Sequence, residues 1–120
     1  MTKDITNKSF DFSVRIVNLS KFLKKEKKES TISKQILRSG TSICANLTEA
    51  EYAQSKLDFI HKNSIALKEA AETEYWLKLL HETKYISTKE YKSLNDDCKE
   101  IIKILITIVK KAKGNLTTNK

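Results

Sequence analysis

The chain of 120 residues carries a formal net charge of +8, contains no proline, and has only two glycines and two cysteines. A chain of this length is expected to form one domain, and the near absence of turn-forming residues favours long helices over β-hairpins. The cysteines belong to no Cys-x-x-Cys or Cys/His cluster, so the composition indicates neither a disulfide framework nor a cysteine-based metal site.

The first predicted helix runs from about residue 9 to residue 26, where apolar residues recur at spacings of three and four. Residues 1–8 are expected to be a flexible N-terminus. The helix ends in a charged run that includes a first group of candidate phosphate-binding lysines: Lys24, Lys25, Lys27 and Lys28. Cations at the C-terminal end of a helix also complement its dipole, and this is the alternative explanation of the group.

The second predicted helix is capped by Ser30 or Thr31 and extends to about Ala53. A polar row at helical spacing runs beside its apolar row. We expect this row and carboxylates of the third helix to form a buried network that fixes helix register, with a catalytic carboxylate pair as the disfavoured alternative. Because Glu72 and Glu74 are two positions apart, one of them should face solvent or another subunit. The expected network consists of Arg38, Ser42, Asn46, Glu49, Glu72 and Glu74. Within it, Ser42 and Asn46 should hydrogen-bond either backbone or a facing side chain.

Gly40 lies within the apolar row of the second helix, where glycine lowers helix stability relative to alanine. Its small neighbours and its place in the row predict the close approach of another helix. A large side chain such as Phe12 or Trp76 is expected to fill the space opposite. Leucine at this position should therefore overpack the core, whereas alanine should be tolerated.

Two capping boxes open the remaining helices. Ser55 with Asp58 starts the third helix, and Ser87 with Glu90 starts the fourth. The third helix is expected to end near residue 83.

The fourth helix is expected to end at Gly114, with a flexible tail over residues 114–120. All connections between the predicted helices are short, so sequential helices should be antiparallel neighbours. The sequence therefore predicts an all-α, up-down-up-down, antiparallel four-helix bundle over residues 9–113.

The fourth helix carries more apolar residues than a monomeric bundle can bury. Besides the row that should face the core, Ile102, Ile106 and Val109 point to other sides, and an apolar circumference indicates burial on more than one side. We expect an oligomer interface there, and a wide monomer core with a few exposed isoleucines is the alternative. A second group of candidate phosphate-binding lysines follows, at the opposite end of the bundle from the first: Lys110, Lys111 and Lys113.

The spacing of the histidines, arginines, serines and cysteines disfavours an enzyme. His61 and His81 lack the Glu-x-x-His spacing of a di-iron bundle, and neither arginine has a histidine at the spacing of a helical ribonuclease. No serine or cysteine has a plausible histidine base beside it, and no glycine-rich phosphate loop is present. We therefore expect no catalytic residue, no metal, no cofactor and no small-molecule substrate.

The first residues lack the apolar core of a secretory signal. The longest apolar stretch, residues 101–109, contains a lysine and is too short to span a bilayer. We therefore expect a cytoplasmic protein that does not bind membranes.

Three runs of residues resemble the bacterial four-helix-bundle proteins that are encoded within intervening sequences of 23S ribosomal RNA. They are Ser9-Phe10-Asp11-Phe12 with Val14-Arg15-Ile16-Val17, Leu37-Arg38 with Ser42-Ile43-Cys44-Ala45-Asn46-Leu47 and Glu49, and Ala71-Glu72-Thr73-Glu74-Tyr75-Trp76-Leu77. The resemblance covers about residues 9–113. The sequence departs from the family at Cys44, where proline is frequent, and at Ala50, where glycine is common.

The resemblance implies a homopentamer with no established enzymatic activity. It also implies likeness to the accessory protein of diversity-generating retroelements, a pentameric basic bundle that binds nucleic acid and a reverse transcriptase. Together with the charge, it leads us to expect a non-enzymatic oligomeric adaptor that binds RNA, or a protein–nucleic acid complex, weakly.

Because almost all the cations are lysines, contacts to nucleic acid should be made to phosphate rather than to bases. A protein-interaction scaffold with no nucleic-acid role is the alternative function. A lysine-rich proteome would produce the same positive charge without any acidic partner.

Overall fold

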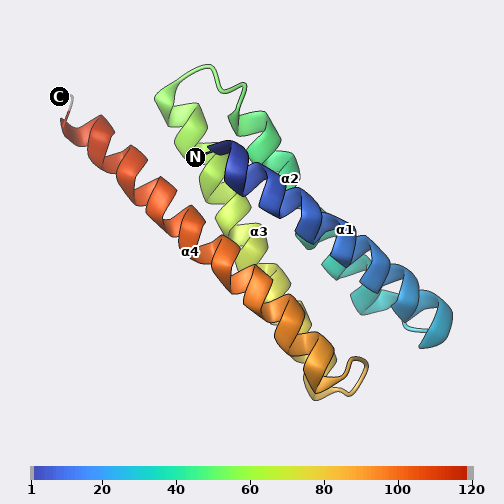
Figure 1. Cartoon of the computed structure of the whole chain (residues 1–120). Coiled ribbons are helices and arrows are strands. Elements are labelled where there is room, and N and C mark those ends of the chain that lie inside the picture. Colours follow the sequence, from blue (N-terminus) through green and yellow to red (C-terminus); the bar gives the residue numbers. More distant parts are fainter. Residues whose placement is uncertain (1, 119–120) are drawn as a thin grey trace.

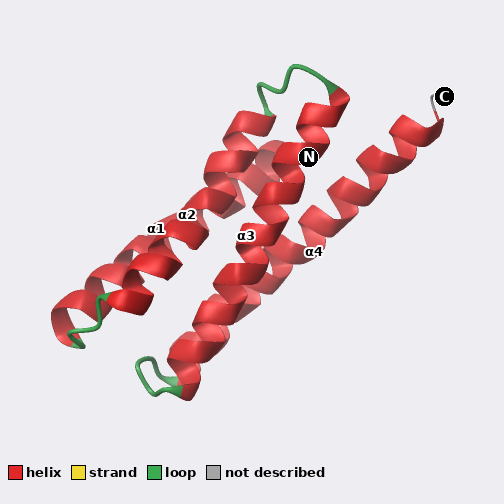
Figure 2. Ribbon diagram, turned by 180° about the vertical axis from the view of Figure 1, so that it is seen from behind, coloured by secondary structure: helices red, strands yellow, loops and turns green. Residues whose placement is uncertain are grey.

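In the computed structural model, which describes residues 2–118, the chain forms four α-helices joined by short turns. They are α1 (Thr2–Glu26), α2 (Thr31–Ala50), α3 (Lys56–Glu82) and α4 (Thr88–Thr118). No strand occurs within the described range. Successive helices run antiparallel and form an elongated bundle of 53 × 22 × 21 Å (Figure 1, Figure 2). The predicted all-α class with four helices is confirmed.

The serine of each expected capping box caps its helix, whereas the reciprocal bond from the acidic side chain to the serine N–H is not formed in either of these two described turns; Asp58 Oδ2 accepts from the Gln54 N–H at 3.2 Å. The hydroxyl of Ser55 accepts a hydrogen bond of 3.0 Å from the Asp58 N–H, and the hydroxyl of Ser87 accepts one of 3.1 Å from the Glu90 N–H. Each bond satisfies a backbone donor that the first turn of a helix leaves without a partner. The start of α3 and the start of α4 are therefore dictated locally.

The turn before α2 is capped differently from the prediction. The side chain of Ser30 makes no capping bond, and Glu29 instead accepts a hydrogen bond of 2.9 Å from the Ser33 N–H. The carboxylate adds a negative charge at the positive end of the helix dipole, which a hydroxyl cannot supply. α2 also ends at Ala50, before the predicted Ala53.

Each turn at one end of the bundle holds a lysine in the left-handed region of backbone space, with φ of 55° at Lys28 and 67° at Lys84. At the end of α3 the Lys84 N–H donates to the His81 carbonyl (3.0 Å) and the Tyr85 N–H donates to the Leu80 carbonyl (2.9 Å). This pair of bonds is the Schellman arrangement, in which glycine is the usual residue. The chain therefore ends this helix without glycine and fixes a lysine in the turn.

α1 begins at Thr2 rather than near residue 9, which corrects the sequence prediction. Ile5 is buried in the core, seven residues before Phe12 and therefore on the same face of the helix. Residues 2–8 thus form part of the bundle. The sequence signal was weak because Ile5 is the only apolar residue among these seven.

α4 continues through Gly114 to Thr118, so Gly114 does not end the helix as predicted. No glycine of the described chain has a positive φ, the conformation that a glycine cap would require. A Cβ atom at Gly114 would meet nothing within 4 Å. The remainder of the expected tail, residues 119–120, lies outside the described residues.

The core runs between the helices and is mainly aliphatic. Two hydroxyl pairs cross between helices inside it: Ser20 and Ser33 have their oxygens 2.8 Å apart, and Thr73 donates to Ser39 over 2.9 Å. Fully buried side chains of the core include Ile5, Phe12, Ile16, Leu23, Ile36, Ile43, Leu77, Leu80, Leu94, Ile101 and Leu105.

Gly40 of α2 lies against Ile16 of α1, not against Phe12 or Trp76 as the sequence suggested. The prediction that Gly40 allows another helix to approach closely is correct. The neighbour was wrong because helical spacing identifies the buried face of α2 without indicating which residue of α1 stands opposite.

α1 and α4 contact each other least among the neighbouring pairs of helices. Polar side chains join them: Arg15 Nη1 lies 2.7 Å from Asp97 Oδ2, and Lys8 Nζ lies 3.0 Å from Glu100 Oε1. The fourth side of the bundle, between α1 and α4, therefore has the sparsest contact between neighbouring helices and is bridged by ion pairs. This fourth side carries the groove described below.

Candidate nucleic-acid interface

The first lysine group lies at the C-terminal end of α1 and in the following turn. All four of its side chains are exposed, and none forms an ion pair with a described residue. The turn between α3 and α4 lies at the same end of the bundle (Figure 2) and adds exposed Lys84 and Lys89. We call the six lysines together the basic end: Lys24, Lys25, Lys27, Lys28, Lys84 and Lys89.

Sequence analysis missed Lys84 and Lys89 as members of this surface because they are some 60 residues away along the chain from the α1 group. The antiparallel order of the helices predicts that these lysines lie near the α1 group. In an up-down-up-down bundle the first and third turns necessarily lie at one end. The acidic side chains Glu26, Glu29 and Glu90 are interspersed there, so the basic end is not uniformly positive.

The second lysine group occupies the C-terminal part of α4, at the other end of the bundle. Lys110, Lys111 and Lys113 are all exposed. The chain therefore presents two separate basic surfaces at opposite ends of the bundle, as predicted (Figure 1).

The predicted polar network between α2 and α3 exists only in part. Arg38 forms ion pairs with Glu72 and with Glu69, whose Oε2 lies 3.2 Å from Arg38 Nη1. The same oxygen of Glu72 accepts a hydrogen bond of 2.9 Å from the indole of Trp76. The Arg38 side chain is 50% exposed, so the network is at the surface rather than buried.

Glu69 was not predicted as a member of this network, although it lies three residues before Glu72 on the same face of α3. The other expected members are elsewhere. Glu49 pairs with Lys62 at 2.7 Å. Glu74 faces α4, where its charge acts on the thiol of Cys98.

The small polar residues of α2 do not reach a neighbouring helix. The Ser42 hydroxyl donates to the Arg38 carbonyl (2.6 Å), and the Asn46 amide donates to the Ser42 carbonyl (2.8 Å). These bonds return to the same helix, four residues back, which is a common alternative for such side chains. Of the two partners expected for these side chains, backbone or a facing side chain, the structure shows the backbone, so neither residue joins the network with α3.

Neither thiol has the environment of a nucleophile. Burial, and then the charges of Glu74 and Asp97, raise the pKa of the Cys98 thiol to about 12. Its Sγ donates to the Ala70 carbonyl at 3.3 Å. Burial also raises the pKa of the Cys44 thiol, although a hydrogen bond to Thr48 opposes this. Both sulfurs stay protonated at neutral pH, whereas thiol chemistry requires the thiolate.

The residues proposed for self-association differ in exposure. Ile106 is 41% exposed and Ile102 is partly exposed, so both offer apolar surface on α4. Val109 is buried within its own chain, which removes it from the predicted interface. Other large exposed apolar side chains are Phe10, Val14, Tyr52, Leu57 and Tyr75.

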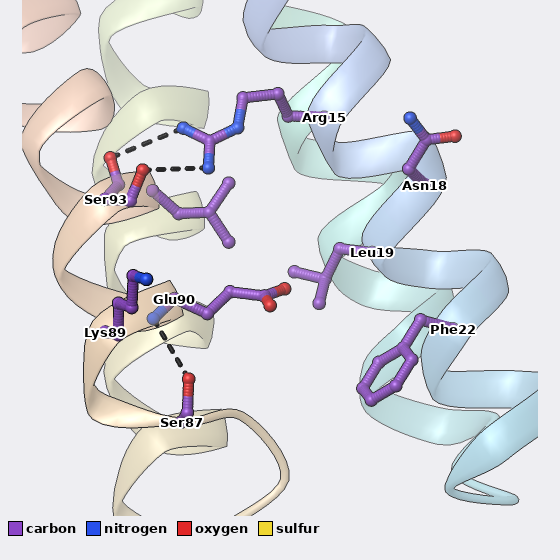
Figure 3. A pocket seen from close by; sticks show the side chains of 9 residues that line it. Arg15, Asn18, Leu19, Phe22, Ser87, Lys89, Glu90 and Ser93 are labelled. Atoms are coloured by element: carbon purple, nitrogen blue, oxygen red, sulfur yellow. Dashed lines mark hydrogen bonds between the residues drawn. The ribbon is translucent and has the colours of Figure 1, made fainter.

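A groove lies between α1 and the first turns of α4, and sequence analysis did not predict it. It consists of two adjoining hollows that share Phe22, Ser87 and Glu90. We call the hollow of about 560 Å³ the inner hollow and the one of about 490 Å³ the outer hollow. Phe22 and Leu19 point from α1 toward α4, and Glu90 points from α4 toward α1 (Figure 3). We call this feature the α1–α4 groove.

The α1–α4 groove joins the basic end. Lys89 lines the inner hollow, and Lys27 and Lys84 line the outer one. Arg15 closes the inner hollow, where it donates to the Ser93 hydroxyl over 2.9 Å (Figure 3). Its guanidinium also pairs with Asp97. The guanidinium is thus held by the protein, whereas the lysines remain available to an anion.

Within residues 2–118, no group of histidine, cysteine, aspartate and glutamate side chains has a geometry that could hold a metal ion. None of the helices in this part of the chain is long and apolar enough to cross a bilayer.

The model of the family described as 23S rRNA-intervening sequence protein matches residues 1–107. The fold is also similar to the crystal structure of a protein of unknown function from the S23 ribosomal protein family of Bacteroides thetaiotaomicron VPI-5482. The two chains are 60% identical, the alignment covers 91% of this chain and 97% of that one, and the TM-score is 0.89. No curated protein matches the sequence.

Proposed function

Since this chain belongs to the family of 23S rRNA-intervening sequence proteins, we propose that it is a non-enzymatic, oligomeric helical-bundle protein that binds RNA weakly through surface lysines. The observation that carries the proposal is the basic end, where two turns distant in sequence contribute lysines to one surface. Lysine binds phosphate as a point charge and gives little base readout, so affinity should depend little on sequence.

Self-association would strengthen such binding. The exposed Ile106 and partly exposed Ile102 support an interface on α4, and the family resemblance favours five copies. Repetition of the basic end around an oligomer raises the effective concentration of weak sites along one RNA. We therefore propose a pentamer that gains avidity for RNA from several modest contacts.

The proposal includes no catalysis, in line with the protonated thiols and the ion-paired carboxylates around Arg38. It places the protein in the cytoplasm, where the two free cysteines would remain reduced.

The test is the binding of a fluorescently labelled structured RNA, followed by anisotropy between about 50 and about 200 mM salt. We expect measurable binding at low salt that falls steeply as salt rises, because phosphate contacts release counterions. Replacing Lys24, Lys25, Lys27 and Lys28 by glutamine should lower both the affinity and the salt slope. A matched control replaces four exposed lysines outside both groups by glutamine: Lys56, Lys68, Lys99 and Lys103.

Equal losses in the two quadruple variants would indicate a general charge effect rather than a basic end that binds RNA. Absence of binding by the native chain at low salt would contradict the proposal. That result would favour a protein-interaction scaffold, for which the exposed Phe10, Val14 and Tyr75 offer apolar contact surface.

A further inference from the structure

The α1–α4 groove combines an aromatic ring, an unpaired carboxylate and lysines within one concave surface. Phe22 is 38% exposed although it is a large apolar side chain, and it lies in the wall of both hollows. We propose, on the basis of the RNA-binding function above, that this groove binds single-stranded RNA. In this site one base stacks on Phe22, its amino group donates to Glu90, and the flanking phosphates contact Lys27 and Lys84.

Phe22 provides the stacking surface. Base–aromatic stacking is a main source of affinity for single strands, and it requires a ring that a base can reach. Lys27 Nζ lies over a face of the Phe22 ring, 5.8 Å from its centre, so a base that stacks on that face displaces the ammonium toward the flanking phosphate. His81, which also lines the groove, is already stacked on Tyr91 with the ring centres 4.5 Å apart, and it bonds to Thr88.

Glu90 determines where the phosphates can lie. Its carboxylate points into the inner hollow (Figure 3) and forms no ion pair among the described residues. An unpaired carboxylate repels phosphate and accepts hydrogen bonds from the exocyclic amino groups of bases, as carboxylates do from cytosine N4. The base therefore enters the inner hollow, and the backbone follows the lysines outside it.

Lys84 and Lys27 lie at the outer hollow, on the two sides of the groove. The turn that ends α3 fixes the backbone of Lys84 in its left-handed conformation. The bonds that hold it run from the Lys84 N–H to the His81 carbonyl and from the following N–H, of Tyr85, to the Leu80 carbonyl. The two phosphates that flank a stacked base can thus each contact one lysine, Lys27 from the α1–α2 turn and Lys84 from the α3–α4 turn. A duplex keeps its bases stacked on one another and cannot offer one to the groove, so the site selects single strands.

The test measures the binding of fluorescein-labelled single strands of cytidine, adenosine or uridine, and of the cytidine strand in a duplex with its complement. We expect the native chain to prefer single strands over the duplex, and cytidine and adenosine over uridine. Phe22→Ala should weaken binding of the cytidine strand about tenfold. Phe22→Trp should retain it, because tryptophan also stacks. Phe10→Ala, an exposed phenylalanine of the same helix outside the groove, is the matched control and should bind like the native chain.

Glu90→Gln tests the carboxylate separately. We expect this variant to bind uridine and cytidine strands equally, because an amide can donate to uracil as well as accept from cytosine. Circular dichroism melts of each variant show whether it is folded.

Three outcomes would overturn the site while leaving RNA binding intact: equal affinity of Phe22→Ala and Phe10→Ala, equal affinity for duplex and single strand, or an unchanged base preference in Glu90→Gln. A native chain that binds no RNA at low salt would overturn the proposed function and this site together.

Discussion

Gly40 of α2 lies directly against the side chain of Ile16 of α1. A Cβ atom at Gly40 would lie 2.7 Å from Cγ2 and 2.9 Å from Cγ1 of Ile16. Real Cβ atoms do not come this close to a neighbour, and Ile16 is fully buried and branched at its own Cβ. Its side chain has little freedom to move away, so the absence of a side chain at Gly40 is a requirement of the packing.

Gly40→Ala is therefore expected to destabilise the fold by about 1–3 kcal/mol through overpacking, even though alanine favours the helix itself. This reverses the expectation from helix propensity alone, which is that alanine would be tolerated. Urea unfolding followed by circular dichroism measures the change. The matched control is Gly114→Ala, where a Cβ atom would meet nothing within 4 Å and stability should rise slightly or stay unchanged. An increase in stability for Gly40→Ala would show that Ile16 can move.

Much of the fold could be predicted from the sequence because its signals are local. The capping boxes at Ser55 and Ser87 set two helix starts, and apolar spacing identified the buried faces. The start of α1 was missed because a single apolar residue, Ile5, carries the signal there. The end of α4 was missed because Gly114 is tolerated inside an exposed helix end.

The candidate site was less predictable because it depends on contacts between distant residues. Helical spacing placed Arg38 and Glu72 correctly on facing surfaces, yet it could not decide between backbone and a facing side chain as the partner of Ser42 and Asn46. The α1–α4 groove depends on how closely α1 and α4 approach each other. No local pattern encodes that distance, so the sequence did not single out Phe22.

Lys84→Gly is expected to stabilise the protein by about 0.5–1 kcal/mol, because glycine adopts a positive φ without the steric cost that lysine bears. The Schellman bonds of the turn use backbone atoms and should persist. The control is Lys78→Gly, at an exposed position inside α3, which should destabilise by about 1 kcal/mol. Thermal melts of the two variants should shift in opposite directions. A shift in the same direction would indicate that the positive φ of Lys84 does not lower the stability of the protein.

The raised pKa of the Cys98 thiol should make the free energy of unfolding fall in alkaline solution. Its pKa is raised from 9.0 to about 12 in the fold, so between these values the unfolded chain loses a proton that the folded chain keeps. The unfolded state is then favoured as pH rises, by up to about 1.4 kcal/mol per pH unit from this group. Unfolding free energies at pH 8 and pH 10 should differ less in Cys98→Ala than in the native chain. An identical pH dependence in both would contradict the raised pKa.

The apolar surface of α4 should carry self-association. Ile102→Glu combined with Ile106→Glu is expected to reduce the oligomer to single chains, because burying unpaired carboxylates in an interface costs several kcal/mol. Light scattering after size-exclusion chromatography measures the mass. The matched control, Lys103→Glu with Thr107→Glu, places the same number of carboxylates at exposed neighbouring positions of α4 and should leave the oligomer intact. If both double variants keep the native mass and helicity, the interface lies on another face, and if the native chain is monomeric at micromolar concentration, there is no oligomer.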